Sequence, residues 1–355
     1  MRTKMPIILL ILVKFKIEFT TSSDKLKGSK PMKSLRSKLA ILALCALGAG
    51  AAFAQSWTAA TVRIVVPYPP GTEPDVLARD MIAGLTKSTG KTFVVDNKPG
   101  ANGIIGTDLV AKGEADGSVM LMVDRLAIVT NPMLYSKMPY KWEESLKPVT
   151  DVATVGLYVG MREGAPYKNF NEFIAWAKAN PKKVNVGTGG NGHVSHIGME
   201  MLAQSQGVSF TYVPYKGLAP ALQGMLSNEV DVVMSGGLSL GEIAKSGKVR
   251  MMVGGEPRRA PLLPDVPTVT EAGGKAGSIP STAFSLFVPS KVPDAMVAQI
   301  NKAVADVISV ADFKAKYTAR ALDVRPNSPA ELMNLLKAET VKYDKIIRDA
   351  GIKIE

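Results

Sequence analysis

Cysteine and histidine are almost absent from this sequence, and their scarcity excludes several kinds of site. The 355 residues include one cysteine and two histidines. The cysteine, Cys45, lies in an N-terminal stretch that we expect to be removed, which would leave no thiol and no disulfide. His193 and His196 lie three positions apart, and no third histidine is present to complete a zinc site. We therefore predict no metal and no cofactor, and we interpret both histidines as hydrogen-bonding groups at a helix start.

The signature of a serine hydrolase is also missing. The segment 192–196 reads Gly-His-Val-Ser-His, which lacks the second glycine of a G-x-S-x-G nucleophile elbow. No other recognisable pair of acid and base, and no activated nucleophile, is present. The sequence therefore predicts a protein that is not an enzyme, and a hydrolase or isomerase with an unfamiliar site is the alternative.

Basic residues are in excess over the whole chain, but most of the excess is N-terminal. The formal net charge is +12, from 43 Lys and Arg against 31 Asp and Glu. Ten of these basic and two of these acidic residues lie within residues 1–54, so the remainder carries only +4. That remainder has no run of Lys and Arg interleaved with aromatic residues, so we predict no nucleic-acid partner.

The N-terminal segment has the pattern of a secretory signal peptide. Three basic residues within 33–38 precede the apolar run 39–47, and Ala-Phe-Ala at 52–54 forms a cleavage site. The run is too short to span a bilayer comfortably. Met32 is the expected start of the signal, and the residues before it would be an upstream extension. We predict export with cleavage after residue 54.

Two alternatives remain at this end of the chain. Cys45 would carry a lipid if the signal were that of a lipoprotein, although Leu44 stands where a small residue is preferred. The run 6–13 would belong to a real extension, although its eight residues cannot cross a bilayer.

The 301 residues after the signal are enough for two domains, and strand-like runs alternate with helical patterns. This alternation predicts an α/β fold. Strands are predicted at 62–66, 92–95, 119–123, 154–159, 184–187, 211–213, 230–234, 249–253 and 283–288. Helices are predicted at 75–89, 103–112, 169–179, 194–206, 218–227, 239–246, 294–308 and 328–350.

The segment 62–90 predicts a buried strand, a sharp turn and a helix whose N-terminus is open. A Pro-Pro-Gly sequence at 69–71 ends the strand, and Asp75 is the expected N-cap. First-turn N–H groups and the helix dipole favour a carboxylate or phosphate at such a point. A turn with a purely structural role is the alternative.

Two further junctions have the same strand-to-helix character. The segment 187–193 reads Gly-Thr-Gly-Gly-Asn-Gly-His and resembles a dinucleotide fingerprint only superficially. The segment 212–217 contains a proline turn and Lys216, whose side chain could bind an anion or could simply be solvated. The glycine turn without a ligand is again the alternative.

Several motifs occur together in one order along the chain. They are VVPYPPG at 65–71, VDNKPGANG at 95–103, NPMLY at 131–135, GTGGNGH at 187–193, VPYKG at 213–217 and LPDVPTVTEAG at 263–273. From about residue 62 to residue 352, the chain resembles the Bug family of periplasmic solute-binding proteins, which are the receptors of tripartite tricarboxylate transporters.

The resemblance implies a type II periplasmic binding protein fold, with two α/β lobes, two crossing strands and a ligand in the cleft between the lobes. The crossings are expected near 155–160 and 282–288. Lobe one would combine residues 55–155 and 281–355, and lobe two would hold residues 156–280. It further implies a monomer in the Gram-negative periplasm whose partners are the integral-membrane permease subunits.

In proteins that resemble this one, a carboxylate is held by backbone N–H groups and bridging waters from loops of both lobes. The matching loops are 69–75, 124–131, 187–193, 214–217 and 235–237. The residues expected to bind the ligand are Pro70, Gly71, Thr72, Glu73, Asp75, Asp124, Arg125, Thr188, Gly189, Asn191, His193, Tyr215, Lys216, Ser235 and Gly236.

Three departures from the family pattern affect the expected ligand. Glu73 stands where a small residue is usual and would oppose a second ligand carboxylate. Asp124 and Arg125 also replace small residues, and Arg125 could pair with Glu73, bind a carboxylate or form a solvated surface pair. The segment 235–237 reads Ser-Gly-Gly where an Asp–Asn pair is common. We hypothesise that the ligand need not be citrate or another tricarboxylate.

Together these observations predict a periplasmic protein that captures a small organic acid and delivers it to a membrane permease. Binding alone would be the mechanism, with two lobes that close around the ligand. A ligand sensor that reports to a signalling partner is the alternative within binding proteins.

Overall fold

The computed structural model describes residues 57–352. The predicted signal peptide, the expected start at Met32 and Cys45 lie outside the described residues. Within the described part, none of the helices combines the length and the apolar character that crossing a membrane requires.

Strands and helices alternate along the described chain, as the sequence predicts. The strands are β1 (Thr61–Val66), β2 (Thr92–Asn97), β3 (Val119–Asp124), β4 (Leu146–Arg162), β5 (Asn185–Thr188), β6 (Thr211–Pro214), β7 (Val232–Gly236), β8 (Val249–Gly254), β9 (Ser281–Pro289) and β10 (Leu322–Asp323). The helices are α3 (Glu73–Thr89), α4 (Ile104–Ala111), α5 (Arg125–Leu134), α6 (Trp142–Ser145), α7 (Phe170–Ala179), α8 (Val194–Gln206), α9 (Leu218–Leu226), α10 (Gly237–Ala244), α11 (Asp294–Ile308), α12 (Ala311–Thr318) and α13 (Pro329–Ala350), with a short 3-10 turn η1 (Ala101–Gly103).

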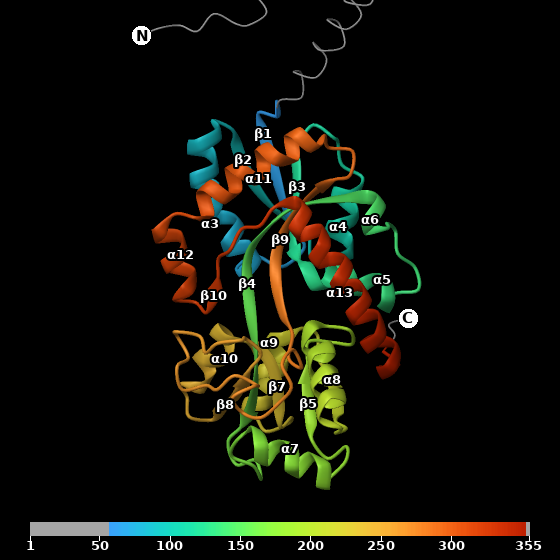
Figure 1. Cartoon of the computed structure of the whole chain (residues 1–355), viewed down its shortest axis with the longest axis vertical. Helices are drawn as coiled ribbons and strands as arrows, with labels where there is room; N and C mark the ends of the chain where they lie inside the picture. The colour runs from blue at the N-terminus through green and yellow to red at the C-terminus, as the bar shows by residue number, and fades with distance from the viewer. Residues whose placement is uncertain (1–56, 353–355) are drawn as a thin grey trace, which may run out of the picture. The chain divides into compact units, whose positions relative to one another are not determined.

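The strands form two sheets that share β4. In the first lobe the order is β2-β1-β3-β9-β4, with β10 on the far side of β4. In the second lobe β4 lies between β7 and β8, and β7 is followed by β5 and β6. Neighbours β1, β2 and β3 are parallel, as are β5, β6 and β7, while β9 runs antiparallel to β3 and β4. Figure 1 shows both groups of strands, with β4 passing from one to the other.

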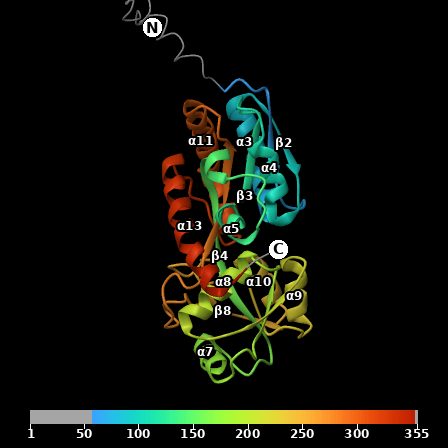
Figure 2. The same ribbon diagram turned by 90° about the vertical axis from the view of Figure 1, so that its right-hand side faces the viewer.

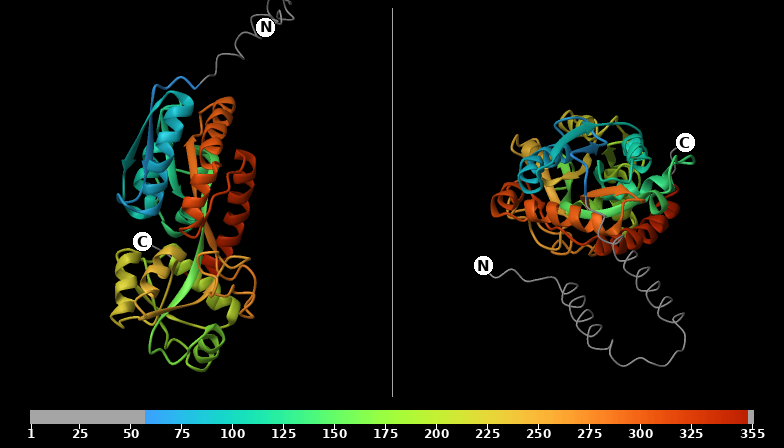
Figure 3. Two further views of the ribbon diagram at one scale, coloured as in Figure 1. Left: turned by 90° about the vertical axis from the view of Figure 1, so that its left-hand side faces the viewer. Right: turned by 90° about the horizontal axis from the view of Figure 1, so that it is seen from above.

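One point on β4 separates its two sets of partners. Up to Gly156 it pairs with β9, and from Leu157 onward it pairs with β7. The predicted crossing at 155–160 therefore lies inside β4, and the one predicted at 282–288 lies inside β9. The view in Figure 3 shows β4 and β9 as the strands that join the two groups of elements. The predicted fold, with two α/β lobes and two crossing strands, is confirmed.

Helices cover both faces of the sheet in the first lobe. Val62, Ile64 and Val66 of β1 pack into the core under α3 and α11, whereas Val65 faces the core under α4, α5 and α13. Successive side chains of a strand point to opposite faces, so a strand covered on both sides reads as a continuous apolar run. Figure 1 shows α3, α11 and α12 on one side of these strands and α4, α5 and α13 on the other.

Helices likewise cover the sheet of the second lobe, and one helix reaches it from the first. Helices α7 and α8 share a core with β5 and β7, and α9 and α10 contribute to a separate core with β8. The long helix α13 extends to α8, where the Gln204 side-chain amide donates to the Ile346 carbonyl at 3.3 Å. Figure 2 shows α13 running alongside β4 toward the second lobe.

Two local predictions are wrong. The segment 124–131, which was expected to be a loop, forms most of α5, and all residues from Arg125 to Asn131 are buried. A helix that is buried on every side has no amphipathic stripe, so the periodicity of its sequence does not identify it as a helix. Helix α3 begins at Glu73 with Thr72 as N-cap, not at Asp75, because Pro74 is well tolerated in a first turn.

Gly106 allows α4 to lie directly on the end of β1. A Cβ at Gly106 would come within 2.9 Å of Pro67 Cβ and 3.2 Å of the Lys98 carbonyl oxygen. The second contact is with rigid backbone, so there is no flexible side chain that could give way. This close approach holds α4 against the turn that follows β1.

We expect Gly106→Ala to lower the free energy of unfolding by about 1–3 kcal/mol, because overpacking outweighs the better helix propensity of alanine. Gly241→Ala is the matched control, since a Cβ in that helix meets only Leu263 Cδ2 at an ordinary 3.5 Å. The control should gain up to about 1 kcal/mol. Urea unfolding of both variants measures the difference, and equal effects would contradict the proposed close packing.

Candidate functional site

The turn after β1 is held by Asp75. Asp75 Oδ2 accepts a hydrogen bond from the Gly71 N–H at 2.8 Å, and Oδ1 accepts from the Asn97 side-chain amide at 3.0 Å. Burial disfavours the charged form, but hydrogen bonds from Arg79, Gly71 and Asn97 outweigh it and lower the pKa of Asp75. Gly71 itself has a φ of 82°, which glycine adopts without strain. Asp75 is therefore occupied in shaping the turn.

Glu73 is also occupied, by a residue far along the chain. Its two carboxylate oxygens each accept a hydrogen bond from Arg320 at 3.1 Å, in a bidentate pair. The alternative in which Arg125 pairs with Glu73 is therefore wrong. The carboxylate is turned toward the end of α12, and its charge is balanced there.

Arg125, the first residue of α5, belongs to a largely buried network of ion pairs. It donates to Asp151 Oδ2 at 2.5 Å and to both oxygens of Glu339 on α13, at 2.7 and 2.9 Å. Burial opposes its charge, but the carboxylates of Asp151 and Glu339 raise the pKa of Arg125. The alternatives of a ligand-binding fork and a solvated pair are therefore both wrong. Sequence could not show this, because Glu339 lies 214 positions away.

A cavity of about 860 Å³ lies where the loops of both lobes meet. The helices α3, α5, α8 and α9 all begin at its wall. It is lined by Pro67, Tyr68, Pro69, Thr72, Pro99, Gly100, Ala101, Asn102, Gly103, Asp124, Leu126, Ala127, Thr130, Gly189, Gly192, His193, Val194, Lys216, Gly217, Leu218, Ala219 and Pro220.

Helix N-termini from both lobes therefore lie at one cavity, and that of α4, whose N-cap Gly103 is in the lining, lies there as well. Helices α3 and α9 have no side chain that caps their first turn, so N–H groups there stay available to a ligand. On α8 the His193 ring accepts from the Ser195 N–H at 3.2 Å, and His196 Nδ1 accepts from the Gly192 N–H at 3.1 Å. The interpretation of both histidines as groups that bond to the helix start and its loop is thus confirmed. The cavity favours negative charge without a cluster of cations.

Few charged side chains line this cavity. Lys216 is exposed and, within the described part of the chain, makes no ion pair or hydrogen bond through its side chain. Burial, and then the proximity of His196, lower the pKa of His193 to about 4, so its ring is neutral near pH 7. Lys216 is therefore the cationic side chain that a carboxylate could meet there.

Asp124 is the carboxyl group in the lining. It ends β3 and caps α5, where its Oδ1 accepts from the Leu126 N–H at 2.9 Å and from the Thr282 hydroxyl. Burial raises the pKa of Asp124 to about 6, although the bonds from Thr282 and Leu126 favour the charged form. The Tyr68 hydroxyl oxygen accepts from the Asp124 N–H at 3.1 Å.

Only some of the predicted site residues line the cavity. Ser235 is buried in β7, and the Tyr215 hydroxyl donates to Glu229 at 3.0 Å instead of facing the ligand space. The residues found in the lining, which remain candidates, are Thr72, Asp124, Gly189, His193 and Lys216. The residues that lie outside it are Pro70, Gly71, Glu73, Asp75, Arg125, Thr188, Asn191, Tyr215, Ser235 and Gly236.

The sequence-based selection of residues missed the turn before α4. Asn102 has a φ of 49°, its side chain donates to Asn131 Oδ1 at 2.8 Å, and the Asn131 amide donates back to the Asn102 carbonyl at 3.0 Å. The Asn-Gly pair at 102–103, a combination that favours a positive φ at the asparagine, was the available signal within the motif at 95–103. The turn forms one wall of the cavity together with Tyr68 and Thr130.

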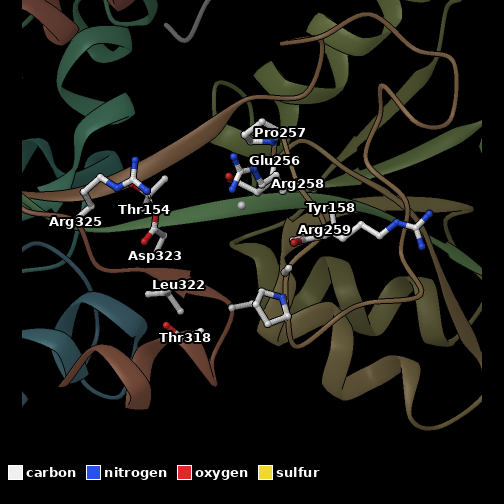
Figure 4. A pocket seen from close by; sticks show the side chains of 14 residues that line it. Thr154, Tyr158, Glu256, Pro257, Arg258, Arg259, Thr318, Leu322, Asp323 and Arg325 are labelled. Carbon is white, nitrogen blue, oxygen red and sulfur yellow. Dashed lines mark ion pairs between the residues drawn. The ribbon is translucent and has the colours of Figure 1, made fainter. Parts of the chain in front are cut away.

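A second cavity, of about 580 Å³, lies at the other edge of the two sheets, beside β10. Figure 4 shows Glu256 and Arg258 from the second lobe facing Asp323 and Leu322 from the first. No helix among the described residues begins at its wall. The larger cavity, at the carboxyl ends of β1, β3 and β5, is therefore the better candidate for a ligand.

The two lobes, the shared strand and the cleft define a two-lobed solute-binding protein. Residues 77–352 match the family described as tripartite tricarboxylate transporter family receptor, and the chain belongs to this family. The resemblance to the Bug receptors is thereby confirmed. A UPF0065 protein from the tcbD-tcbE intergenic region of Pseudomonas sp. strain P51 is 30% identical over 283 residues, which cover 80% of this chain and 84% of that protein.

Solved structures of similar proteins have the same fold. The R. palustris protein Rpa4515, solved with adipate, has a TM-score of 0.76 at 28% identity and covers 84% of this chain and 99% of its own. The periplasmic binding protein BugD has a TM-score of 0.72 at 28% identity, with 83% and 99% coverage. MatC from Rhodopseudomonas palustris, solved with bound malate, has a TM-score of 0.71 at 27% identity, with 81% and 98% coverage.

We expect Arg125→Ala to lower the free energy of unfolding by about 3–5 kcal/mol, because the buried Asp151 and the half-buried Glu339 would lose the guanidinium that balances their charge. Arg348→Ala is the control, since its i,i+4 pair with Asp344 is exposed and should contribute less than about 0.5 kcal/mol. Chemical denaturation at pH 7 measures both. A loss for Arg125→Ala as small as that of the control would contradict the network's role.

We expect Asp124→Asn to stabilise the protein at neutral pH but not in acid. The folded carboxyl has a pKa of about 6 against 3.8 for the ordinary group, so the folded state binds the extra proton and wild-type stability falls as pH rises through this interval. The variant has no carboxyl group to ionise at this position. Its free energy of unfolding should therefore exceed that of wild type by at most about 3 kcal/mol above pH 6, and the difference should vanish near pH 4.

The measurement for Asp124→Asn is urea unfolding of wild type and variant at pH 4, 5, 6 and 7.5. The difference between the two proteins isolates Asp124 from His193, whose lowered pKa acts in the opposite direction. A difference that does not change with pH would refute the assignment.

Proposed function

We propose that this protein binds a small organic acid in the cleft between its lobes and delivers it to the integral-membrane permease subunits of a tripartite tricarboxylate transporter. The observation that carries the proposal is the convergence of the N-termini of α3, α5, α8 and α9 on one cavity. Ligand-facing N–H groups and aligned helix dipoles favour a carboxylate at that point. The solved relatives with adipate and malate hold dicarboxylates, which agrees with this ligand class.

The closing movement follows from the arrangement of the strands. We assign residues 55–155 and 281–355 to lobe one and residues 156–280 to lobe two, so that β4 bends near Gly156. Both lobes contribute helix N-termini to the cavity, so a bound acid would hold the lobes together. The closed protein, acting as a monomer, would then present a surface to the permease that the open form lacks.

The experiment is a thermal-shift and calorimetric screen of the protein recovered from the periplasm after a cycle of unfolding and refolding that removes a co-purified ligand. The panel holds dicarboxylates, tricarboxylates, aromatic acids, amino acids and uncharged analogues of each. An acid at a hundred times its Kd should stabilise the protein by about 2.7 kcal/mol. Stabilisation by uncharged analogues in place of acids would contradict the proposal.

A matched pair of variants tests the role of the helix N-termini. Ala219 is exposed in the first turn of α9 and lines the cavity. Ala219→Glu places a carboxylate where it suits the helix dipole and repels a ligand anion, so the fold should persist while affinity falls about tenfold or more. Ala219→Gln has the same size without the charge and should bind within about threefold of wild type. Equal losses in both variants would point to bulk, not to charge.

A further inference from the structure

Asp124 is the one acidic side chain that lines the cleft within the described part of the chain. Both of its protein hydrogen bonds, from the Leu126 N–H and the Thr282 hydroxyl, go to Oδ1. Oδ2 accepts no hydrogen bond from the described residues, and it is not fully buried. An acceptor oxygen therefore stays open to the cavity.

The surroundings of Asp124 do not balance its charge. The charge of Arg125 favours the ionised form of Asp124, but all three of its donor nitrogens bind Asp151 and Glu339. One guanidinium thus already faces two carboxylates before Asp124 is counted, which makes three acids around one base.

The remaining neighbours do not supply the missing charge either. Tyr68 and Tyr343 contribute neutral phenols, and their pKa values are raised by burial and by nearby carboxylates. Lys342, one turn beyond Glu339 on α13, forms no ion pair among the described residues, and burial lowers its pKa. The charge of Asp124 must therefore be balanced by a proton or by a ligand.

The rest of the cleft has the opposite character. Lys216 is the cation in the lining, His193 is neutral, and the helix N-termini add partial positive charge. A ligand that spans this space meets an electropositive region and one uncompensated carboxylate. A second ligand carboxylate beside Asp124 would require one of the two acids to take up a proton.

We propose, building on the function proposed above, that Asp124 is a specificity-determining residue that selects organic acids carrying an ammonium group and discriminates against acids that bring a second carboxylate to this position. The ammonium donates to Asp124 Oδ2 and supplies the charge that Arg125 cannot, while the ligand carboxylate lies toward Lys216 and the helix N-termini. The class of ligand is a zwitterionic amino acid.

The test compares acids of equal chain length by titration calorimetry at pH 7.5. The five-carbon series is glutarate, glutamate and 5-aminopentanoate, and the six-carbon series is adipate, 2-aminoadipate and 6-aminohexanoate. The proteins are wild type, Asp124→Asn and Asp306→Asn, the last being a control in which an exposed aspartate on α11 loses the same charge. Asparagine is also a good N-cap, so Asp124→Asn retains the start of α5.

In wild type and in Asp306→Asn, we expect at least one amino acid to bind about tenfold or more tightly than the diacid of its length. In Asp124→Asn that ratio should shrink by about tenfold or more. Wild-type affinity for the amino acid should rise from pH 5 to pH 7.5 as Asp124 ionises, whereas affinity for the diacid should fall.

Tight binding of a diacid by wild type, with the same preference in Asp124→Asn, would overturn this inference and leave the proposed function intact. An amino acid that binds tightly and equally to all three proteins would also overturn it. No binding by any acid of the panel would contradict the proposed function and this inference with it.

Discussion

Strand β4 is the constraint on which the rest of the structure depends, because a single continuous strand carries ladder hydrogen bonds in both lobes. Its partner changes from β9 to β7 between Gly156 and Leu157. Backbone groups committed to two sheets cannot separate without losing buried hydrogen bonds, so relative movement of the lobes is limited to bending at this point. A Cβ on Gly156 would come within 2.7 Å of Glu256 Cγ, which shows how closely the second lobe approaches the junction.

Backbone N–H groups are the main donors left free at the cleft, because the nearby guanidinium groups are already paired. Arg79 is bound to Asp75, Arg320 to Glu73, and Arg125 to Asp151 and Glu339. These pairs hold the turn after β1 and fix α12 and α13 against the first lobe. What remains in the lining is a set of helix N-termini and one lysine.

Asp124 connects stability to recognition, since the same side chain ends β3, caps α5 and lines the cleft. Burial, and to a smaller extent the Glu339 carboxylate, raise the pKa of Asp124 to about 6. A ligand that supplies positive charge there would also lower the free-energy cost of ionising Asp124 in the folded state. Substitutions at Asp124 should for this reason change ligand preference and unfolding together, whereas those at Ala219 should change binding alone.

Much of the fold could be predicted from local patterns, and less of the site. The run 62–66 and the Pro-Pro-Gly turn at 69–71 predicted β1 and its open end correctly, but α5 was missed because it is buried on all sides. The sequence by itself determined the alternation of strands and helices and the turns between them, because these depend on side-chain periodicity and local backbone preference. The tertiary structure decided that Glu73 pairs with Arg320, that Arg125 pairs with Glu339 and that several helix N-termini line one cavity, because these contacts join residues far apart in the chain.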